Sequence, residues 1–286
     1  MDGFLARRLP ESLRVGSVKD PSLPHDASTR PSAGCLRAKS YESRASSYEP
    51  EFSLARSSQL AAGSWQLAAD LPGSVSAMDV TITKLVHACL LVDVGGTRTL
   101  IDPGMFSWQD DRFDPAMVEG VDRILITHEH ADHVSVEFLC AAIERSNGAE
   151  VETTSALQAI LAKEGIEAVT EGTPQFAAPH ERIPMGPGPQ NVGFHVAGVL
   201  SHPGDSHSFV ETMPILAMPF AAPWGSLTNG ADRARLVRPR YVIPIHDWFL
   251  SEPGRTFMYR LAKMALDEDG IELVQIGDFE TVTLSV

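Results

Sequence analysis

Residues 121–133 read V-D-R-I-L-I-T-H-E-H-A-D-H. The apolar run from Ile124 to Ile126 predicts a short buried strand. It ends in a loop that holds three histidines and two carboxylates within six positions: His128, Glu129, His130, Asp132 and His133. Histidine and aspartate are costly to bury, and each such group would need a partner of its own. Because imidazole nitrogens and carboxylate oxygens bind zinc and similar metals, we interpret this loop as a site for one or two divalent cations rather than as a solvated polar loop.

Three later segments repeat the same arrangement of an apolar strand followed by a ligand-type side chain. Residues 177–180 (A-A-P-H) end in His180, residues 200–206 (L-S-H-P-G-D-S) contain Asp205, and residues 241–247 (Y-V-I-P-I-H-D) contain His246. One such strand end would be weak support, since strand ends often carry polar caps. Together they predict a site to which several strand ends contribute.

The pattern H-x-H-x-D-H after an apolar strand resembles the signature of the metallo-β-lactamase-fold hydrolases. The three later segments match the later metal motifs of that family in chain order. The resemblance covers about residues 79–286 and is nearest to bacterial metal-dependent hydrolases related to ascorbate-phosphate lactonase. It implies an α+β fold, a four-layer αββα sandwich.

Carried over residue by residue, the resemblance implies two adjacent metal ions. The first ion would take His128, His130 and His180. The second would take Asp132, His133 and His246, and Asp205 would bridge the two. His195 is the alternative to His180, although its place inside V-G-F-H-V indicates the middle of a strand.

Three further residues are candidates for supporting roles. Asp102 in L-I-D-P-G resembles the buried aspartate that orients the ligand loop in the family; the alternative is a turn aspartate before proline. His87 in V-H-A-C-L-L recurs in relatives near the mouth of the site, where it would contact substrate, or it is a partly buried histidine at a strand end. Trp224 in A-A-P-W-G-S either lines the pocket or belongs to the ordinary core.

The predicted function is that of a dinuclear metal-dependent hydrolase. Cysteine is absent from every ligand position, which favours zinc, with manganese or iron as alternatives, and makes antibiotic hydrolysis an unexpected native activity. Hydroxide on the metals would attack an ester, lactone or phosphodiester of a small metabolite, with Asp132 as the catalytic residue that holds the nucleophile.

Three other functions compete with this interpretation. A mononuclear iron oxidoreductase similar to the persulfide dioxygenases would share the H-x-H-x-D-H loop, but the H-T-P-G-H segment of that branch is missing. An RNA-processing nuclease of the same fold would carry D-C-G-E-G where this chain has I-D-P-G-M-F. A binding protein without catalysis is disfavoured by the complete ligand set.

Composition narrows the class of partner. The chain has 286 residues, 43% of them hydrophobic, and a net charge of −14 that lies almost entirely after residue 76. An acidic body disfavours binding to nucleic acid or to an anionic membrane, because both attract positive surface. The chain has no apolar run of the ~20 residues that a membrane helix needs, and its first residues lack the apolar core of a secretory signal. Three widely spaced cysteines in no C-x-x-C pair also favour a reducing compartment, so we expect a cytoplasmic protein.

The chain divides near Met78. Residues 1–77 are rich in serine, arginine and proline, which predicts a disordered tail or a start codon assigned too early. Residues 78–286 are patterned as one domain. Strands are predicted near 79–86, at a hairpin that turns at Gly95-Gly96, and at 151–152, 168–169, 175–178, 192–200, 213–219, 241–245, 272–276 and 281–286. Helices are predicted at 134–146, 155–164, 229–237 and 253–268, covering two mixed sheets packed face to face.

Overall fold

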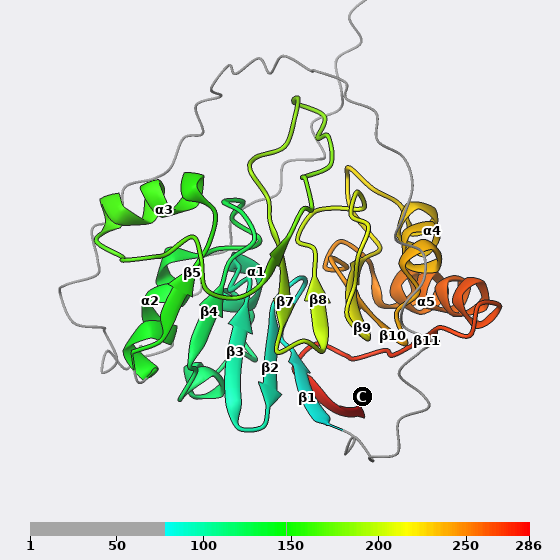
Figure 1. Ribbon diagram of the computed structural model, residues 1–286, viewed down its shortest axis with the longest axis horizontal. Helices are drawn as coiled ribbons and strands as arrows, with labels where there is room; N and C mark the ends of the chain where they lie inside the picture. The colour runs from blue at the N-terminus through cyan, green and yellow to red at the C-terminus, as the bar shows by residue number, and fades with distance from the viewer. Residues whose placement is uncertain (1–77, 147) are drawn as a thin grey trace, which may run out of the picture. The chain divides into compact units, whose positions relative to one another are not determined.

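The structure, a computed structural model, describes residues 78–146 and 148–286. The expected tail, residues 1–77, lies outside the described residues. The described part of the chain consists of two six-stranded sheets with helices on their outer faces (Figure 1).

The first sheet has the strand order β12-β1-β2-β3-β4-β5. Its strands are β1 (Asp79–Lys84), β2 (Leu90–Val94), β3 (Thr97–Ile101), β4 (Arg123–Leu125), β5 (Glu150–Glu152) and β12 (Glu280–Ser285). The β2–β3 hairpin turns at Gly95-Gly96, as predicted, with φ of 59° and 86°. Strands β3, β4 and β5 run parallel, so the end of β4 that leads into the motif loop lies beside the ends of its neighbours.

The second sheet has the order β11-β10-β9-β8-β7-β6. Its strands are β6 (Gln175–Phe176), β7 (Gly193–Val196), β8 (Leu200–His202), β9 (Ile215–Pro219), β10 (Tyr241–Ile245) and β11 (Glu272–Leu273). Strands β8 to β11 are parallel, which places the residues after β8 and β10 at one edge of this sheet.

The layers follow from the two-residue period of the strands. Along β2 and β3, Leu90 and Ile101 point into the core between the two sheets, whereas Leu91 and Leu100 point outward to the first helical layer. The helices are α1 (Met105–Trp108), α2 (Val136–Arg145), α3 (Ser155–Leu161), α4 (Leu227–Val237) and α5 (Glu252–Asp267), with 3-10 turns at Pro115–Val118 and Ala162–Glu164. Helices α2 and α3 cover the first sheet, and α4 and α5 cover the second. The αββα architecture is therefore confirmed. Among the described residues, no helix has the length and apolarity needed to cross a membrane.

The main error of the sequence prediction lies at residues 192–200. They form not one strand but the antiparallel pair β7 and β8, which turns at Ala197-Gly198 with φ of 49° and 69°. Tight turns in this conformation usually have asparagine or aspartate before the glycine, and here the residue is alanine. Residues 168–169 form only an isolated bridge, and β11 is shorter than predicted.

Candidate metal centre

The ends of strands from both sheets bring together eight ligand-type side chains, which form two groups. Within each group, the ligand atoms all lie within 4.8 Å of one another. One group contains His128, His130, His180 and Asp205; the other contains His87, Asp132, His133 and His246. The motif loop follows β4, His180 follows β6, Asp205 follows β8, and His246 follows β10. The structure thus brings together all seven residues that the sequence predicted to meet, with His87 in addition.

In the first group, three ring nitrogens lie within hydrogen-bond distance of one another. His130 Nδ1 lies 3.0 Å from His128 Nε2 and 3.3 Å from His180 Nε2. The other nitrogen of His128 lies 3.0 Å from the Thr127 hydroxyl, and that of His180 lies 2.6 Å from the Glu181 carbonyl. Since a carbonyl oxygen only accepts, His180 carries its proton on Nδ1, and its Nε2 presents a lone pair to the group. The three nitrogens therefore converge on one point, where either a proton of His130 or a metal ion can lie between them.

Asp102 sets the orientation of the motif loop. Its Oδ1 accepts from the backbone N–H of Thr127 at 2.8 Å, and its Oδ2 accepts from the Thr127 hydroxyl at 2.9 Å and from His133 Nδ1 at 2.7 Å. With its hydrogen given to Asp102, the Thr127 hydroxyl accepts from His128 Nδ1. The Nε2 atoms of His128 and His133 therefore both face the centre, in the way that buried carboxylates orient histidine ligands elsewhere.

Asp205 lies between the two groups and turns one oxygen to each. Its Oδ2 is 3.3 Å from His180 Nε2 and 3.7 Å from His128 Nε2, whereas its Oδ1 is 2.9 Å from His133 Nε2 and 3.2 Å from His246 Nε2. The Oδ1 atom and the Nε2 atoms of His133 and His246 are buried without a hydrogen-bond partner.

The charges of the buried groups fit this arrangement. Burial, reinforced by His133, holds the pKa of His128 well below its usual range. Burial also lowers the pKa of His133, but Asp205 and Asp102 outweigh it and raise that pKa well above the usual range. Although burial opposes it, His133 and His246 hold the pKa of Asp205 well below its usual range. A buried carboxylate aimed at two imidazoles attracts a cation into the space that they enclose.

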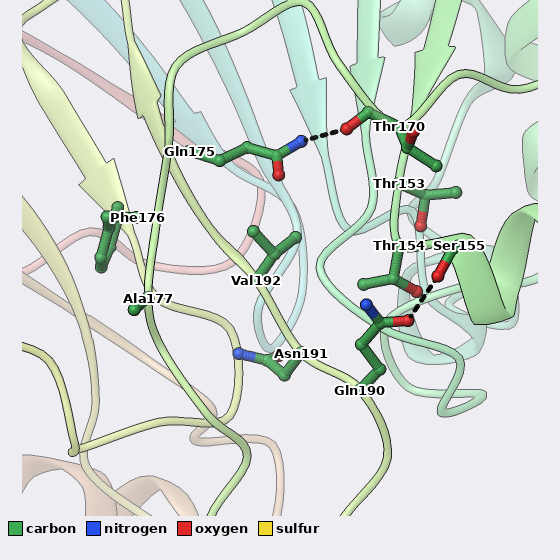
Figure 2. Close-up of a pocket in the computed structure, with 10 residues that line it drawn as sticks. All are labelled: Thr153, Thr154, Ser155, Thr170, Gln175, Phe176, Ala177, Gln190, Asn191 and Val192. Atoms are coloured by element: carbon green, nitrogen blue, oxygen red, sulfur yellow. Dashed lines mark hydrogen bonds between the residues drawn. The ribbon is translucent and has the colours of Figure 1, made fainter. Parts of the chain in front are cut away.

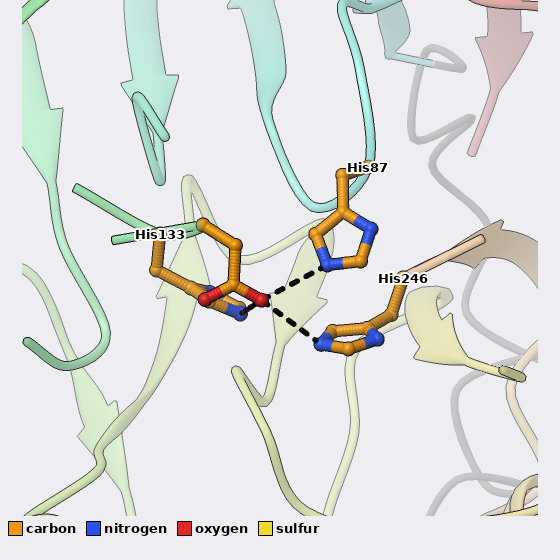
Figure 3. Close-up of side chains that lie close together, drawn as sticks. His87, His133 and His246 are labelled. Atoms are coloured by element: carbon orange, nitrogen blue, oxygen red, sulfur yellow. Dashed lines mark hydrogen bonds and ion pairs between the residues drawn. The ribbon is translucent and has the colours of Figure 1, made fainter. Parts of the chain in front are cut away.

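His87 has a different role from the other histidines of its group. Its Nδ1 accepts from the backbone N–H of Trp248 at 3.3 Å, so its proton is on Nε2, which donates to Asp132 Oδ2 at 3.2 Å. Burial holds the pKa of His87 at about 4, so the ring is neutral at pH 7. Figure 3 shows His87, His133 and His246 turned toward one another, with the His87 ring 3.9 Å from that of His246. His87 is fully buried, so it orients Asp132 from beneath rather than standing at the mouth of the site.

Backbone conformation at the centre is strained. His87, Asp102 and His246 have φ of 65°, 48° and 61°, a left-handed region that side chains other than glycine rarely adopt. Next to them, a Cβ on Gly104 would lie 1.7 Å from the carbonyl oxygen of Asp132, so only glycine permits the close approach of this backbone to the motif loop. Such strain is typical of functional sites that the surrounding fold holds in place.

A buried ion-pair network lies behind His246. Lys84 Nζ is fully buried and lies 2.6 Å from Oδ2 of Asp247, the residue after His246. Tyr259 also donates to Asp247, and Arg255 Nη1 lies 3.1 Å from Asp278 Oδ2. The sequence did not predict this network, although Lys84 shares the inward face of β1 with Val80 and Ile82, a position where a charge requires a buried partner.

Trp224 lines the centre, which is the first of the two alternatives that the sequence offered for this residue. Its ring centroid lies 5.9 Å from that of His180 and 5.3 Å from that of His246, so it spans the two groups. His195, the alternative to His180, lies in β7 and stacks on Phe176 at 4.4 Å, and it belongs to neither group.

A separate hollow of about 500 Å³ lies to one side (Figure 2). Its lining is neutral, with Thr153, Thr154 and Gln190 among the residues that form it. It borders the centre through Asn191, whose Oδ1 accepts from the backbone N–H of Asp205 at 3.3 Å. None of the clustered histidines or carboxylates lines it, so the hollow is distinct from the metal centre.

Comparison with known proteins agrees with these observations. Residues 81–246 match the sequence profile of the β-lactamase superfamily domain. The chain is 33% identical over 204 residues to protein Rv0786c of Mycobacterium tuberculosis, covering 64% of this chain and 92% of that protein. It is 28% identical over 194 residues to a metal-dependent hydrolase of Pyrobaculum arsenaticum, covering 56% of this chain and 80% of that protein. The fold is similar to that of Igni18, a metallo hydrolase of Ignicoccus hospitalis, with a TM-score of 0.54 and 18% identity over 73% of this chain and 99% of Igni18.

Proposed function

Since this chain belongs to the β-lactamase superfamily as a metal-dependent hydrolase with the metallo-β-lactamase fold, we propose that it holds two divalent metal ions and hydrolyses an ester, lactone or phosphodiester of a small metabolite. The observation that carries the proposal is the position of Asp205. Its two oxygens face the Nε2 atoms of two different sets of histidines.

The proposed ligands divide as follows. The first ion would be held by His128, His130 and His180, and the second by Asp132, His133 and His246, with Asp205 shared between them. The buried, unpartnered atoms of His133, His246 and Asp205 support this division, because a buried polar atom without a partner is costly. The ligands are nitrogen and oxygen atoms throughout, which favours zinc, with manganese or iron as alternatives.

Two such ions would stabilise negative charge on the reacting water and on the oxygen of the scissile group. The chain itself would position the water. Asp132, whose side chain is 21% exposed, is the ligand carboxylate that reaches solvent. Burial opposes ionisation of Asp132, but the hydrogen bond from His87 and the nearby His133 hold its pKa below the usual range. It would act as a charged hydrogen-bond acceptor that orients the water.

We also propose a small-molecule substrate and a cytoplasmic location. The chain carries a net charge of −14, which supports a small-molecule substrate over nucleic acid or an anionic membrane.

Metal stoichiometry tests the proposal, and the informative substitution is Asp205→Ala. Elemental analysis after dialysis should find about two metal ions per wild-type chain and about one in Asp205→Ala, since three histidines suffice to hold one ion. Asp232→Ala removes an exposed carboxylate of α4 and serves as the matched control, which should keep two.

A wild-type protein that saturates at one ion, together with an Asp205→Ala variant that keeps it, would contradict the bridging role. The mononuclear iron oxidoreductase would then be the better interpretation. A screen of the metal-loaded protein against lactones, esters and phosphodiesters tests the hydrolase activity independently of the metal count.

A further inference from the structure

Three aromatic side chains form a continuous surface beside the metal centre, here called the aromatic rim: Phe106, Trp248 and Phe249. The rings of Phe106 and Trp248 stack at 3.9 Å with an interplanar angle of 8°. Phe249 meets both edge-on, at 6.0 Å from Phe106 and 5.6 Å from Trp248. Because the three rings support one another, the rim has its shape before any ligand arrives.

The rim leaves much apolar surface in water. Trp248 is 48% exposed and Phe249 is 50% exposed. Single exposed apolar side chains are common, but a contiguous aromatic group at the edge of a polar centre is typical of a binding surface. The position of the rim next to the metal centre also supports a role in binding.

The rim is attached to the second group of ligands. The ring of Phe249 lies 5.4 Å from that of His87 and 5.9 Å from that of His246, and Phe106 lies 5.2 Å from His87. Trp248 also donates its backbone N–H to His87, which in turn holds Asp132. A substrate whose reacting atom lies at Asp132 therefore places its neighbouring atoms within reach of the rim.

The cations near the rim are already neutralised. Lys84 is fully buried against Asp247, and Arg255 is paired with Asp247 and Asp278. Neither can reach across to a phosphate on a bound substrate. Arg182 lies two residues after His180, on the loop that serves the first group of ligands. The side of the centre next to Asp132 and His246 is thus aromatic rather than cationic, which suits an uncharged apolar group.

We propose that the substrate carries a neutral apolar substituent, an aromatic ring or an alkyl chain, next to a scissile ester or lactone, and that Trp248 and Phe249 bind this substituent. The inference rests on the hydrolase function proposed above and adds the class of substrate. In the reaction, the oxygen of water bonds to the acyl carbon, the acyl C–O bond breaks, and a proton from the water ends on the released alcohol oxygen. No oxidant or further reactant is needed.

Two matched pairs of small molecules test the inference on the full-length, metal-loaded protein. The first pair is γ-butyrolactone and γ-phenyl-γ-butyrolactone, for which hydrolysis is followed by acid release. The second is cyclopentanone and 3-phenylcyclopentanone, uncharged rings that cannot be hydrolysed, for which binding is followed by NMR titration. Variants Trp248→Ala and Phe249→Ala probe the rim. Phe257→Ala, which removes an aromatic ring that is 61% exposed on α5, is the control.

The expected result is a preference of roughly tenfold or more for the phenyl member of each pair, in kcat/KM and in Kd. Trp248→Ala and Phe249→Ala should each reduce this preference several-fold, and Phe257→Ala should leave it unchanged. If lactones are hydrolysed without preference, or if the preference survives both rim substitutions, the inference is wrong while the hydrolase function stands.

The ketone pair tests binding at the rim independently of hydrolysis, so the rim can be supported even if the hydrolase function is contradicted. Rim-dependent binding of 3-phenylcyclopentanone without hydrolysis of any lactone, ester or phosphodiester would support the apolar site and contradict the proposed hydrolysis. A stronger preference for a phosphorylated ester that is lost in Arg182→Ala would overturn the inference, because Arg182 and not the rim would then select the substrate.

Discussion

The ring nitrogen that each histidine presents to the centre depends on the hydrogen bond made by its other nitrogen. His133 and His246 give the Nδ1 proton to Asp102 and to the Ala221 carbonyl, respectively, and turn Nε2 inward toward Asp205. His87 does the reverse, since its Nδ1 accepts a backbone N–H and its Nε2 donates to Asp132. Residue type and spacing could predict which histidines meet. They could not predict this difference, because it depends on a backbone amide from residue 248.

Replacing Asp132 with asparagine should reduce turnover far more than stability. Asparagine keeps the shape of the side chain and an oxygen that can accept from His87, but it removes the charge that would orient the reacting water. We expect kcat to fall by roughly 10²-fold or more, by analogy with the loss of a general base. Kinetics on a verified substrate and thermal melting of both proteins check this. Unchanged turnover would remove Asp132 from the mechanism.

At the scale of elements, the sequence predicted the helices and long strands well because their apolar periods are clear. It failed where a turn was short. The Ala197-Gly198 turn splits the predicted strand at 192–200 and creates β8, the element that delivers Asp205. The motif L-S-H-P-G-D-S still located Asp205, because the glycine and proline mark the end of a strand wherever that strand begins. The aromatic rim was not predicted, since it depends on how α1 packs against the segment after β10.

The Lys84–Asp247 pair links β1 of the first sheet to the end of β10 in the second, and it can be tested through stability. Lys84→Met should lower the free energy of unfolding by about 3 kcal/mol at neutral pH, because it leaves Asp247 buried with one charge partner fewer. Chemical denaturation measures this. Lys263→Met, which breaks an exposed pair with Asp267 on α5, is the control and should cost about 0.5 kcal/mol or less.

The same experiment has a pH dependence with a defined sign. Burial opposes it, but Lys84 and Arg255 hold the pKa of Asp247 below its usual range. A lowered carboxyl pKa contributes stability above the unfolded pKa of about 3.9, and that contribution is lost as the pH falls through the folded pKa. The difference between wild type and Lys84→Met should therefore be full above about pH 5 and shrink below about pH 4. A difference that is constant with pH would show that lost packing, not charge, is the cause.

At the scale of the whole molecule, the four layers and the family could both be predicted from one loop motif and the order of later strand ends. The division near Met78 stays a prediction. The backbones of Met78 and Val286 donate hydrogen bonds to each other, at 2.8 and 3.0 Å. The pairing between β1 and β12 therefore starts at residue 78.

We therefore propose that residues 1–77 are dispensable for folding and activity. A fragment of residues 78–286 should melt within a few degrees of the full chain, because it keeps every strand of the two described sheets. It should also retain the same metal content and kcat. An insoluble fragment, or one that is less stable by several kcal/mol, would show that the omitted residues belong to the fold.

The return of β12 to the first sheet has a consequence for synthesis of the protein. Strand β1 is made first among the described strands, but one of its edges pairs with β12, the last of the described strands. Until residues 280–285 have left the ribosome, that edge presents unpaired amide and carbonyl groups, which readily pair with other chains. His246 also emerges late, so a nascent chain already displays the histidines of the motif loop before it can enclose a metal ion. Metal capture by the complete centre therefore requires that residue 246 has left the ribosome.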